Sequence, residues 1–290
     1  MTAFLAVVDT DGFSAAARKL GVSPSVITRA VTELEERLGT RLLTRTTRFV
    51  RLTDTGRVYA DNCRRILADL EDADSTAAGT HAEPRGQITI TATVNFGAMY
   101  VAPVVREYLS LYPQVAMHCW FVDRNVNLVD EGVDVAVRIG QLPDSSLQAI
   151  KVGRVRQVMC AAPAYLARHG VPLRPEDLSQ HTIVTATGLT PTPELRFAND
   201  LKIRVQPRMT TTTNESAAAM VAAGFGIARL PLYQIAPAVQ RGELQLVLEA
   251  FERPAVPIHV VHREGRNASS KVRSFIDMTV DALRKDASLQ

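Results

Sequence analysis

The chain has 290 residues with a formal net charge of +3, 46% hydrophobic residues and 22% charged residues. These proportions are ordinary for globular domains and exclude a disordered or collagen-like chain. No uncharged stretch reaches the ~18 apolar residues of a transmembrane helix, no signal peptide is visible, and three cysteines are too few for a disulfide framework. We therefore expect a soluble, cytoplasmic protein with two or three domains.

The positive charge is concentrated at the N-terminus. Residues 1–58 contain nine Lys and Arg residues against six acidic residues, whereas the other 232 residues carry 24 of each kind. This local surplus predicts an N-terminal module that binds a polyanion and a neutral body with a different role. A basic face that is merely solvated is the alternative, and charge alone does not decide between them.

Hydrophobic periodicity predicts three helices in residues 1–38. The first reaches about Val8, and the second spans residues 13–20 before Gly21, a natural left-handed stop. The third opens with Ser23 as its N-cap and Pro24 at its first position, where the missing N–H costs nothing.

The third helix has two different faces. One face is apolar and belongs in a core: Ile27, Val31, Leu34 and Leu38. Another face carries short or hydrogen-bonding side chains: Ser25, Thr28, Arg29 and Thr32. A helix that enters the DNA major groove needs slim polar side chains near its N-terminus. The pattern favours a helix-turn-helix, and a generic three-helix bundle is the alternative.

Residues 41–53 follow as a short β-hairpin. Arg45, Arg48 and Arg51 flank its tip, so the hairpin can lie along phosphates or enter the minor groove as a wing. Binding through such contacts is steeply salt-dependent.

A long helix is predicted from Thr53, its N-cap, to about Ala78. Its apolar stripe consists of Tyr59, Cys63, Ile66 and Leu70. A one-sided rod of this length is not stable alone. A second copy of the chain would cover the stripe and pair two DNA-binding modules; packing against the chain's own body is the alternative.

A polar segment at residues 79–86 separates this helical region from a body in which strands and helices alternate. The alternation predicts mostly parallel α/β sheets in two lobes, with a ligand cleft at the carboxyl ends of the strands. The expected strands are 88–93, 115–122, 133–139, 147–152, 155–162, 182–187, 201–206 and 257–262, and the expected helices are 98–111, 164–169, 215–223, 235–241 and 271–285.

Polar residues at strand ends are the candidate ligand contacts. Thr93 and Asn95 lie where a strand passes into a helix, so free N–H groups and the helix dipole favour an anion there. Thr213 precedes another helix in the same way, and Arg138 ends a strand where it can clamp a carboxylate. An ordinary cap or a buried pair is the alternative for each.

The sequence contains none of the motifs GxSxG, GxxxxGK[ST], HExxH or paired CxxC. His259 and His262 face opposite sides of a predicted strand and do not share a metal easily. Cys63, Cys119 and Cys160 lie singly, the last two within clear apolar runs, and all three are expected to be buried structural thiols. We therefore expect neither an enzyme nor a metal or cofactor site.

Several stretches resemble the LysR-type transcriptional regulators. The most specific are FSAAARKLGVSPSVITR at 13–29, LEERLGTRLLTRTTR at 34–48 and LTDTG at 52–56. Two looser matches lie at 134–140 and 223–231, so the resemblance covers nearly the whole chain.

The resemblance implies a winged helix-turn-helix at 1–57, a dimerising linker helix and hinge at 58–86, and an effector-binding domain at 87–290. That domain has two Rossmann-like lobes like those of periplasmic binding proteins, one at about 87–161 with 263–290 and the other at about 162–262. The implied partners are double-stranded promoter DNA, a small-molecule effector of unknown identity in the cleft, a second copy in a homodimer or homotetramer, and RNA polymerase.

Together with the residue patterns, the resemblance predicts two sets of contacts. The DNA contacts are Phe13, Ser14, Ala15, Arg18, Ser23, Pro24, Ser25, Val26, Thr28, Arg29, Thr32, Arg45, Thr46, Arg48 and Arg51. The effector contacts are Thr93, Val94, Asn95, Phe96, Arg138, Gly140, Thr185, Thr187, Thr213, Asn214 and Phe225.

Two other classes of protein remain. The body alone is compatible with a small-molecule carrier or solute-binding enzyme, which the basic N-terminal module opposes. A sequence-neutral architectural DNA-binding protein is the other, opposed by a neutral body with a plausible cleft; a low ratio of specific to nonspecific affinity would favour it.

Overall fold

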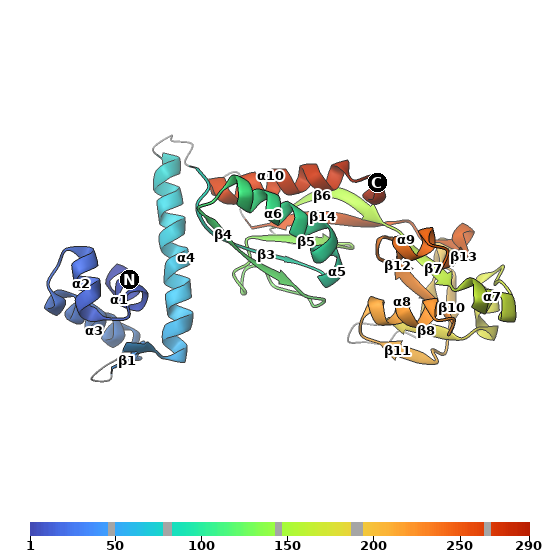
Figure 1. Cartoon of the computed structure of the whole chain (residues 1–290), viewed down its shortest axis with the longest axis horizontal. Helices are drawn as coiled ribbons and strands as arrows, with labels where there is room; N and C mark the ends of the chain where they lie inside the picture. Colours follow the sequence, from blue (N-terminus) through green and yellow to red (C-terminus); the bar gives the residue numbers. More distant parts are fainter. Residues whose placement is uncertain (46–49, 78–82, 143–146, 187–193, 264–267) are drawn as a thin grey trace. The chain divides into compact units, whose positions relative to one another are not determined.

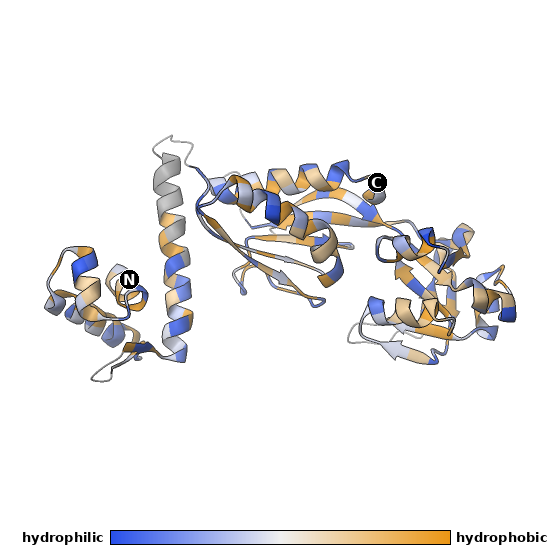
Figure 2. Ribbon diagram, viewed as in Figure 1, coloured by the Kyte–Doolittle hydropathy of each residue, from blue (hydrophilic) through white to orange (hydrophobic). Residues whose placement is uncertain are grey.

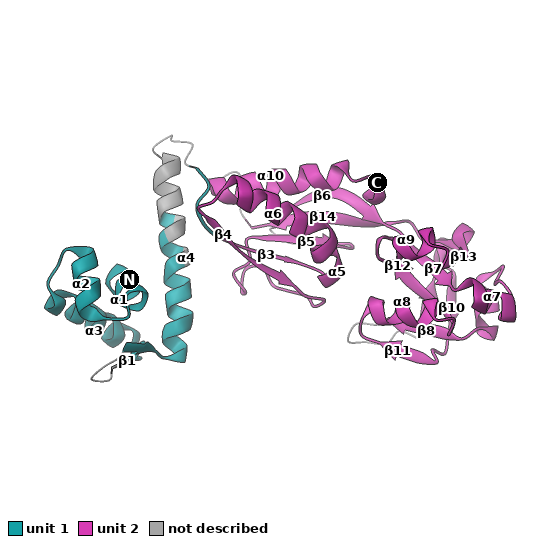
Figure 3. Cartoon of the chain, in the orientation of Figure 1, with its two compact units in different colours: residues 1–87 teal, residues 88–290 magenta. Residues whose placement is uncertain are grey.

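A computed structural model describes residues 1–45, 50–77, 83–142, 147–186, 194–263 and 268–290. The chain forms two compact units, residues 1–87 and residues 88–290 (Figure 3). Within the described ranges, no helix combines the length and apolar character needed to cross a membrane.

The first unit contains the predicted helices and hairpin (Figure 1). Its elements are α1 (Thr2–Asp9), α2 (Phe13–Leu20), α3 (Pro24–Leu38), the antiparallel strands β1 (Leu43–Arg45) and β2 (Val50–Leu52), and α4 (Asp54–Ala77). Gly21 and Gly39 end α2 and α3 with φ values of 67° and 66°, a left-handed conformation that glycine adopts without strain.

The N-terminal part of α4 packs into the core of the first unit. Phe4, Val31 and Leu42 are buried together with Cys63, which α4 contributes to the same core. The ring of Tyr59 packs on Phe4 with centroids 5.8 Å apart. The N-terminal half of the stripe on α4 therefore packs on its own unit, so the prediction that a partner covers the whole stripe is wrong for this half.

The second half of the stripe is different. Ile66 and Leu70 are 50% and 56% exposed in the single chain. An apolar pair spaced one helical turn apart and facing solvent is what a helix leaves for a partner.

The second unit is built around two five-stranded sheets, in which hydrophobic residues gather on the strands (Figure 2). The first sheet has the order β4-β3-β5-β14-β6. Its strands are β3 (Gly86–Ala92), β4 (Val115–Phe121), β5 (Val135–Ile139), β6 (Gln148–Val155) and β14 (Val256–His262).

Helices cover the first sheet. They are α5 (Val94–Phe96), a π-helical turn (Gly97–Val101), α6 (Ala102–Leu111) and α10 (Ser270–Lys285). Tyr108 of α6 joins two of them, because its hydroxyl donates to the Lys271 carbonyl at 2.7 Å and its ring meets Phe275 edge-on at 5.2 Å. We call this sheet and its helices the first lobe.

The second sheet has the order β11-β8-β12-β7-β13. Its strands are β7 (Gln157–Ala161), β8 (Ile183–Ala186), β11 (Met209–Thr211), β12 (Ile227–Pro231) and β13 (Gln245–Val247). With α7 (Pro163–His169), α8 (Asn214–Ala222), α9 (Leu232–Gln240) and a separate hairpin of β9 (Glu194–Arg196) and β10 (Lys202–Arg204), it forms the second lobe.

The two-lobed α/β architecture agrees with the prediction, but the sheets are mixed and not mostly parallel. β3 and β5 run parallel, whereas β14 is antiparallel to β5 and β6. β8 is parallel to β11 and β12, whereas β7 is antiparallel to β12 and β13. β7 and β14 are each the first strand that the chain forms after it enters a lobe, and each is antiparallel to both of its neighbours.

The points at which the chain changes lobe also differ from the expected ones. The predicted boundaries followed residues 161 and 262, but β7 belongs to the second sheet and β14 to the first. The chain therefore crosses at Arg156 and again at residues 252–255. Apolar strand runs do not reveal which of two sheets they join, so the sequence placed both crossings several residues too late.

The three cysteines are free, and Cys63 and Cys160 are buried as predicted. Cys119 is exposed, contrary to the prediction, because it lies on β4 at the edge of the first sheet.

Candidate DNA-reading surface and effector site

The start of α3 presents short polar side chains to solvent. Val26 is 51% exposed, and Ser25 is exposed beside it. The Thr28 hydroxyl donates to the Pro24 carbonyl at 2.9 Å. Because Ile27 on the opposite face is 1% exposed, α3 is fixed in the core while its first turns stay free to enter a groove.

Ser23 occupies the N-cap position of α3, but its side chain accepts no N–H of the helix. Its hydroxyl instead bonds the Ser25 hydroxyl at 2.8 Å. Ser23 therefore holds the predicted N-cap position without a side-chain cap, and its carbonyl accepts the Val26 and Ile27 N–H groups at 3.1 and 3.4 Å.

Arg29 is a strongly exposed charged group on this face. Its side chain is 82% exposed, and its Nε lies 2.7 Å from the Glu33 carboxylate one turn later. Hydrogen bonding and charge attraction from Glu33 raise the pKa of Arg29. The guanidinium is held against the helix by one exposed contact that solvent and DNA can replace.

The wing is attached to α3 by one carboxylate. Glu35 of α3 accepts the backbone N–H groups of Leu42 and Leu43 at 2.7 and 2.9 Å. This pair of charge-assisted bonds fixes the first strand of the wing relative to the helix that carries Arg29. The sequence signals did not indicate this role for Glu35.

Thr53 and Gly56 form the junction between the wing and α4. The Thr53 hydroxyl oxygen accepts the Gly56 N–H at 2.9 Å, which confirms the predicted N-cap, and its O–H donates to the Arg41 carbonyl. A Cβ at Gly56 would lie 2.0 Å from the Leu42 carbonyl oxygen. Only glycine allows this approach between the wing and the helix.

The remaining predicted DNA contacts divide by exposure. Ser14, Arg18, Pro24 and Arg51 are exposed, whereas Phe13, Ala15 and Thr32 are half-buried. Arg45 lies in β1, and Thr46 and Arg48 lie outside the described residues.

In the first lobe, the predicted effector contacts meet at one sheet edge. β3 and β5 run parallel with Thr91 opposite Ala136. Thr93 and Arg138 lie two residues beyond this pair, so both are at the carboxyl edge of the sheet. Gly140 follows there at φ 126°.

The helix start at this edge does not offer a free anion site. The Asp123 carboxylate accepts the Val94 N–H at 3.0 Å, and the Thr93 carbonyl accepts the Gly97 N–H at 2.7 Å. A carboxylate of the chain therefore already occupies part of the site where the sequence predicted an anion.

Asn95 is half-buried and Val94 is 41% exposed, so both can contact a ligand. Phe96 is 0% exposed in the core of the first lobe and stacks on Tyr100. Phe96 packs in the core and does not line a surface, contrary to the prediction.

Arg138 is half-buried and already engaged. Its guanidinium donates to the Val126 carbonyl at 3.0 Å, and burial lowers its pKa. The hydrogen bond orients the side chain and leaves its other N–H groups for a carboxylate.

The second lobe brings together another set of predicted contacts. Thr185 of β8 is paired in register with Thr210 of β11, and their hydroxyls are 3.3 Å apart. Thr213 caps α8, because its hydroxyl oxygen accepts the Ser216 N–H at 3.2 Å. Asn214 is half-buried at the first position of α8. Thr187 lies outside the described residues.

Phe225 does not join this group. It precedes β12, which is parallel to β8, so it lies at the amino edge of the sheet, opposite Thr185 and Thr213. There the Arg208 guanidinium lies 5.5 Å from its ring centroid. The prediction of Phe225 as an effector contact is wrong because α8 carries the chain across the sheet before Phe225.

Tyr233 is a residue that the sequence analysis missed. It begins α9 after the carboxyl end of β12, yet its ring packs with Phe96 and Tyr100 of the first lobe. Burial raises the pKa of Tyr233, and the nearby Thr93 side chain opposes that rise. In the sequence, Tyr233 closely follows an apolar strand, and this position at a strand end could have marked it as a candidate site residue.

Comparison with known proteins covers both units. Residues 1–57 match the family model "Bacterial regulatory helix-turn-helix protein, lysR family", and residues 81–284 match "LysR substrate binding domain". The chain belongs to the LysR family of bacterial transcriptional regulators. It is therefore a regulator with a helix-turn-helix DNA-binding domain and an effector-binding domain, in a family of regulators and not of enzymes.

Individual relatives span nearly the whole chain. An HTH-type transcriptional regulator of Xanthomonas campestris is 34% identical over 98% of this chain and 85% of its own length. The HTH-type transcriptional activator AaeR of Escherichia coli is 31% identical over 97% of this chain and 92% of its own. The solved structure of CrgA from Neisseria meningitidis is 28% identical, with a TM-score of 0.62 over 97% of both chains.

LysR regulators bind promoter DNA and small-molecule effectors and form oligomers.

Proposed function

We propose that this LysR regulator reads a specific promoter sequence through Ser25, Thr28 and Arg29. The observation that carries the proposal is the two-faced α3, with Ile27 buried and Arg29 82% exposed in its side chain. Slim polar groups at the start of a helix match the width and hydrogen-bonding edges of the major groove. Arg45, Arg48 and Arg51 of the wing contact phosphates or the minor groove.

The effector binds between the carboxyl edges of the two sheets. Thr93, Asn95 and Arg138 contribute from the first lobe, and Thr185, Thr187, Thr213 and Asn214 from the second. A ligand that contacts both edges favours one lobe arrangement over another. The ligand carries hydrogen-bonding groups for the hydroxyls, and any carboxylate is directed to Arg138, because Asp123 repels an anion at the start of α5.

The oligomer forms through α4. Ile66 and Leu70 of one subunit pack on the corresponding helix of a second, so two copies of α3 face one operator. The assembly is a homodimer or a homotetramer of such dimers. It acts in the cytoplasm at its promoter, where RNA polymerase is a further partner.

A binding assay tests this function. Fluorescence anisotropy compares DNA upstream of the protein's own gene with an unrelated fragment of equal length across a salt series. We expect a preference of about 10³ or more at physiological salt and a steep decline of affinity with salt. Equal binding of both fragments at every salt concentration would contradict sequence-specific reading.

A further inference from the structure

A row of three basic side chains crosses the first sheet. His259 of β14 is paired in register with Arg138 of β5 on one side and with Lys151 of β6 on the other. Residues paired across neighbouring antiparallel strands point to the same face of a sheet, with Cβ atoms about 4.5–5.5 Å apart. We call these three residues the basic row. Of the three, the sequence indicated only Arg138 as a ligand contact.

The basic row lies on the face of the sheet opposite α6 and α10. Val137 and Val260, each next to a residue of the row, belong to the core that these helices cover. Ala136 and Val261, each two residues from the row, pack instead with Val126. The carbonyl oxygen of Val126 also accepts a hydrogen bond from the arginine of the row. All three basic side chains therefore point to the face that carries Val126.

His259 is uncharged at neutral pH. Its ring is half-buried, and its Nδ1 is buried without a hydrogen-bond partner among the described residues. Burial and the charge of Lys151 both lower the pKa of His259, because each disfavours the imidazolium form. Nε2 is not enclosed in this way, so it is the ring nitrogen that a ligand can reach.

The groups around the basic row leave it positively charged. Lys151 is exposed, and among the residues that the structure describes no carboxylate lies within 4.0 Å of Lys151 or Arg138. Glu131 is the acidic residue whose charge acts on Arg138. Arg124 already binds Glu131 through two hydrogen bonds of 2.9 and 2.6 Å. The charges of that pair oppose each other, so Lys151 and Arg138 determine the charge of the row.

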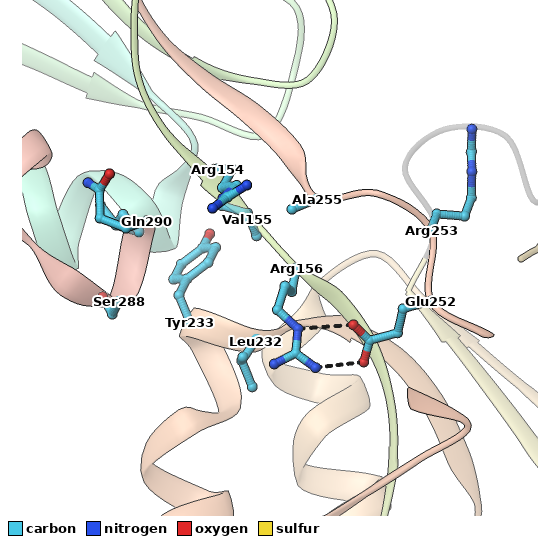
Figure 4. A pocket seen from close by; sticks show the side chains of 11 residues that line it. Arg154, Val155, Arg156, Leu232, Tyr233, Glu252, Arg253, Ala255, Ser288 and Gln290 are labelled. Carbon is cyan, nitrogen blue, oxygen red and sulfur yellow. Dashed lines mark hydrogen bonds and ion pairs between the residues drawn. The ribbon is translucent and has the colours of Figure 1, made fainter. Parts of the chain in front are cut away.

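An ion pair supports the two strands that carry His259 and Lys151. Arg156, which follows β6, forms a bidentate pair with Glu252 at 3.0 and 2.9 Å (Figure 4). Because Glu252 lies shortly before β14, the pair joins the chain segments next to the lobe-facing ends of both strands. Such charge-assisted bonds have a defined geometry, and they stabilise the register that places His259 beside Lys151.

We propose that the basic row binds an oxyanion group of the effector, either a carboxylate or a tetrahedral group such as sulfate or phosphate. This inference rests on the proposed effector site, because Arg138 belongs to both. Arg138 and Lys151 donate charge-assisted hydrogen bonds to the anion from two sides, and the ring of His259 adds a third donor between them. The row therefore extends the effector site across three strands and selects ligands that carry an acidic group.

Binding at the row is coupled to protonation of His259. A bound anion favours the imidazolium form and so raises the pKa of His259 above its value in the free protein. The complex takes up a proton, and affinity rises as the pH falls through the pKa of the complex until the free protein is protonated as well. The charged neighbours are Lys151 and Arg138, with Glu131 and Arg124 beyond them, and none of these types titrates between about pH 5.5 and 7.5.

Calorimetric titration of the full-length protein tests the proposal, with sulfate in one arm and benzoate in the other. Both probes keep their charge in this pH range, and chloride holds the ionic strength constant. We expect saturable binding of at least one probe, and the arm that binds distinguishes a tetrahedral oxyanion from a carboxylate. Lys151→Met and Arg138→Met should each weaken binding by about 10-fold or more.

The pH profile tests the role of His259. Binding to the parent should tighten by about 3-fold or more from pH 7.5 to pH 5.5, and this change should disappear in His259→Gln. His118→Gln removes an exposed histidine of β4, and Lys202→Met removes an exposed lysine of β10 in the second lobe. Both controls should bind like the parent, and thermal unfolding without ligand verifies that each variant is folded.

The proposal fails if neither probe binds up to about 10 mM, if Lys151→Met binds as tightly as the parent, or if the pH dependence persists in His259→Gln. Thr185→Val separates these failures from a failure of the proposed effector site, because it alters the second lobe and leaves the row intact. Binding weakened by Thr185→Val but not by Lys151→Met would overturn the row and retain the site between the lobes. The reverse result would support the row and show that the second lobe does not hold the acidic group.

Discussion

The ring of Tyr233 stands edge-on to the ring of Phe96, with centroids 5.5 Å apart and planes at 84°. The two residues belong to different lobes, yet Tyr233 is 6% exposed within the core of the first lobe. Tyr100 completes the cluster, with its centroid 5.8 Å from that of Tyr233. An aromatic side chain from the second lobe therefore packs into the core of the first lobe, at the edge where the effector is proposed to bind.

Tyr233→Ala should loosen this connection. Removal of a buried aromatic ring costs about 3–5 kcal/mol in the free energy of unfolding, and the loss should be measured by denaturant unfolding. Hydrogen exchange should rise around Phe96 as well as in α9. Exchange confined to α9 would show that the ring does not hold the lobes together.

Tyr233→Phe separates packing from hydrogen bonding. The ring remains, but the hydroxyl that accepts from the Gln234 amide at 2.9 Å is lost. We expect destabilisation of only about 0.5–1.5 kcal/mol and unchanged exchange at Phe96. A loss of unfolding free energy as large as that of Tyr233→Ala would show that the hydroxyl of Tyr233, and not its ring, stabilises the protein.

Thr93→Val tests the proposed effector edge. Valine has nearly the shape of threonine but cannot hydrogen-bond a ligand. The variant should bind operator DNA like the parent while its response to effector is weakened, measured by anisotropy with and without effector. A normal response would place the effector elsewhere.

Arg29→Ala tests DNA reading. Operator affinity should fall by roughly 10-fold or more if the guanidinium contacts a base edge, whereas effector binding and the unfolding temperature stay the same because the Arg29–Glu33 pair is exposed. Unchanged operator affinity would remove Arg29 from the reading surface.

Glu33→Gln is the matched control for Arg29. It frees the guanidinium from its carboxylate partner and removes a negative charge that faces DNA. Operator affinity should therefore rise or stay equal, and this should be most evident at low salt.

Ile66→Glu and Leu70→Glu test the proposed oligomer. Both side chains are at least half exposed in the single chain, so a charge there should leave the first unit folded while it disrupts a helix pair. Light scattering coupled to size exclusion should show smaller particles. Leu173→Glu, at a position 77% exposed in the second lobe, should not change the particle mass.

Gly56→Ala should destabilise the DNA-binding unit by about 1–3 kcal/mol, because the new methyl group collides with the Leu42 carbonyl. Thermal unfolding of the variant measures the loss. Gly12→Ala is the control, since its Cβ would approach only Thr10, at 4.0 Å, and it should be tolerated.

The DNA-binding unit could be predicted closely because its signals are local. The second predicted helix, residues 13–20, coincides with α2, and Pro24 begins α3 as expected. Periodicity, a left-handed glycine and a proline at the first helical position each depend only on neighbouring residues. Ser23 is the N-cap residue as predicted, but its hydroxyl bonds that of a second serine two residues later and not an N–H of the helix.

The effector site was less predictable because it depends on contacts between distant segments. Thr93 and Arg138 were placed together correctly, since parallel strands bring their carboxyl ends to one edge. Phe225 was misplaced because the edge at which it lies depends on the direction of β12. The helix start at Val94 was predicted to be open to an anion, but it is occupied by Asp123, which lies 29 residues later in the sequence. No local pattern contains that information.

The two crossings have a consequence for synthesis of the chain. The first lobe needs β14 between β5 and β6, and β14 is made only after the whole second lobe. The DNA-binding unit and the second lobe are each continuous in sequence and can fold as they emerge from the ribosome. Residues 88–155 cannot complete the first lobe until the last 35 residues have been synthesised. A ribosome that stops near residue 250 would therefore release a DNA-binding protein that lacks a complete first lobe and cannot receive the effector signal.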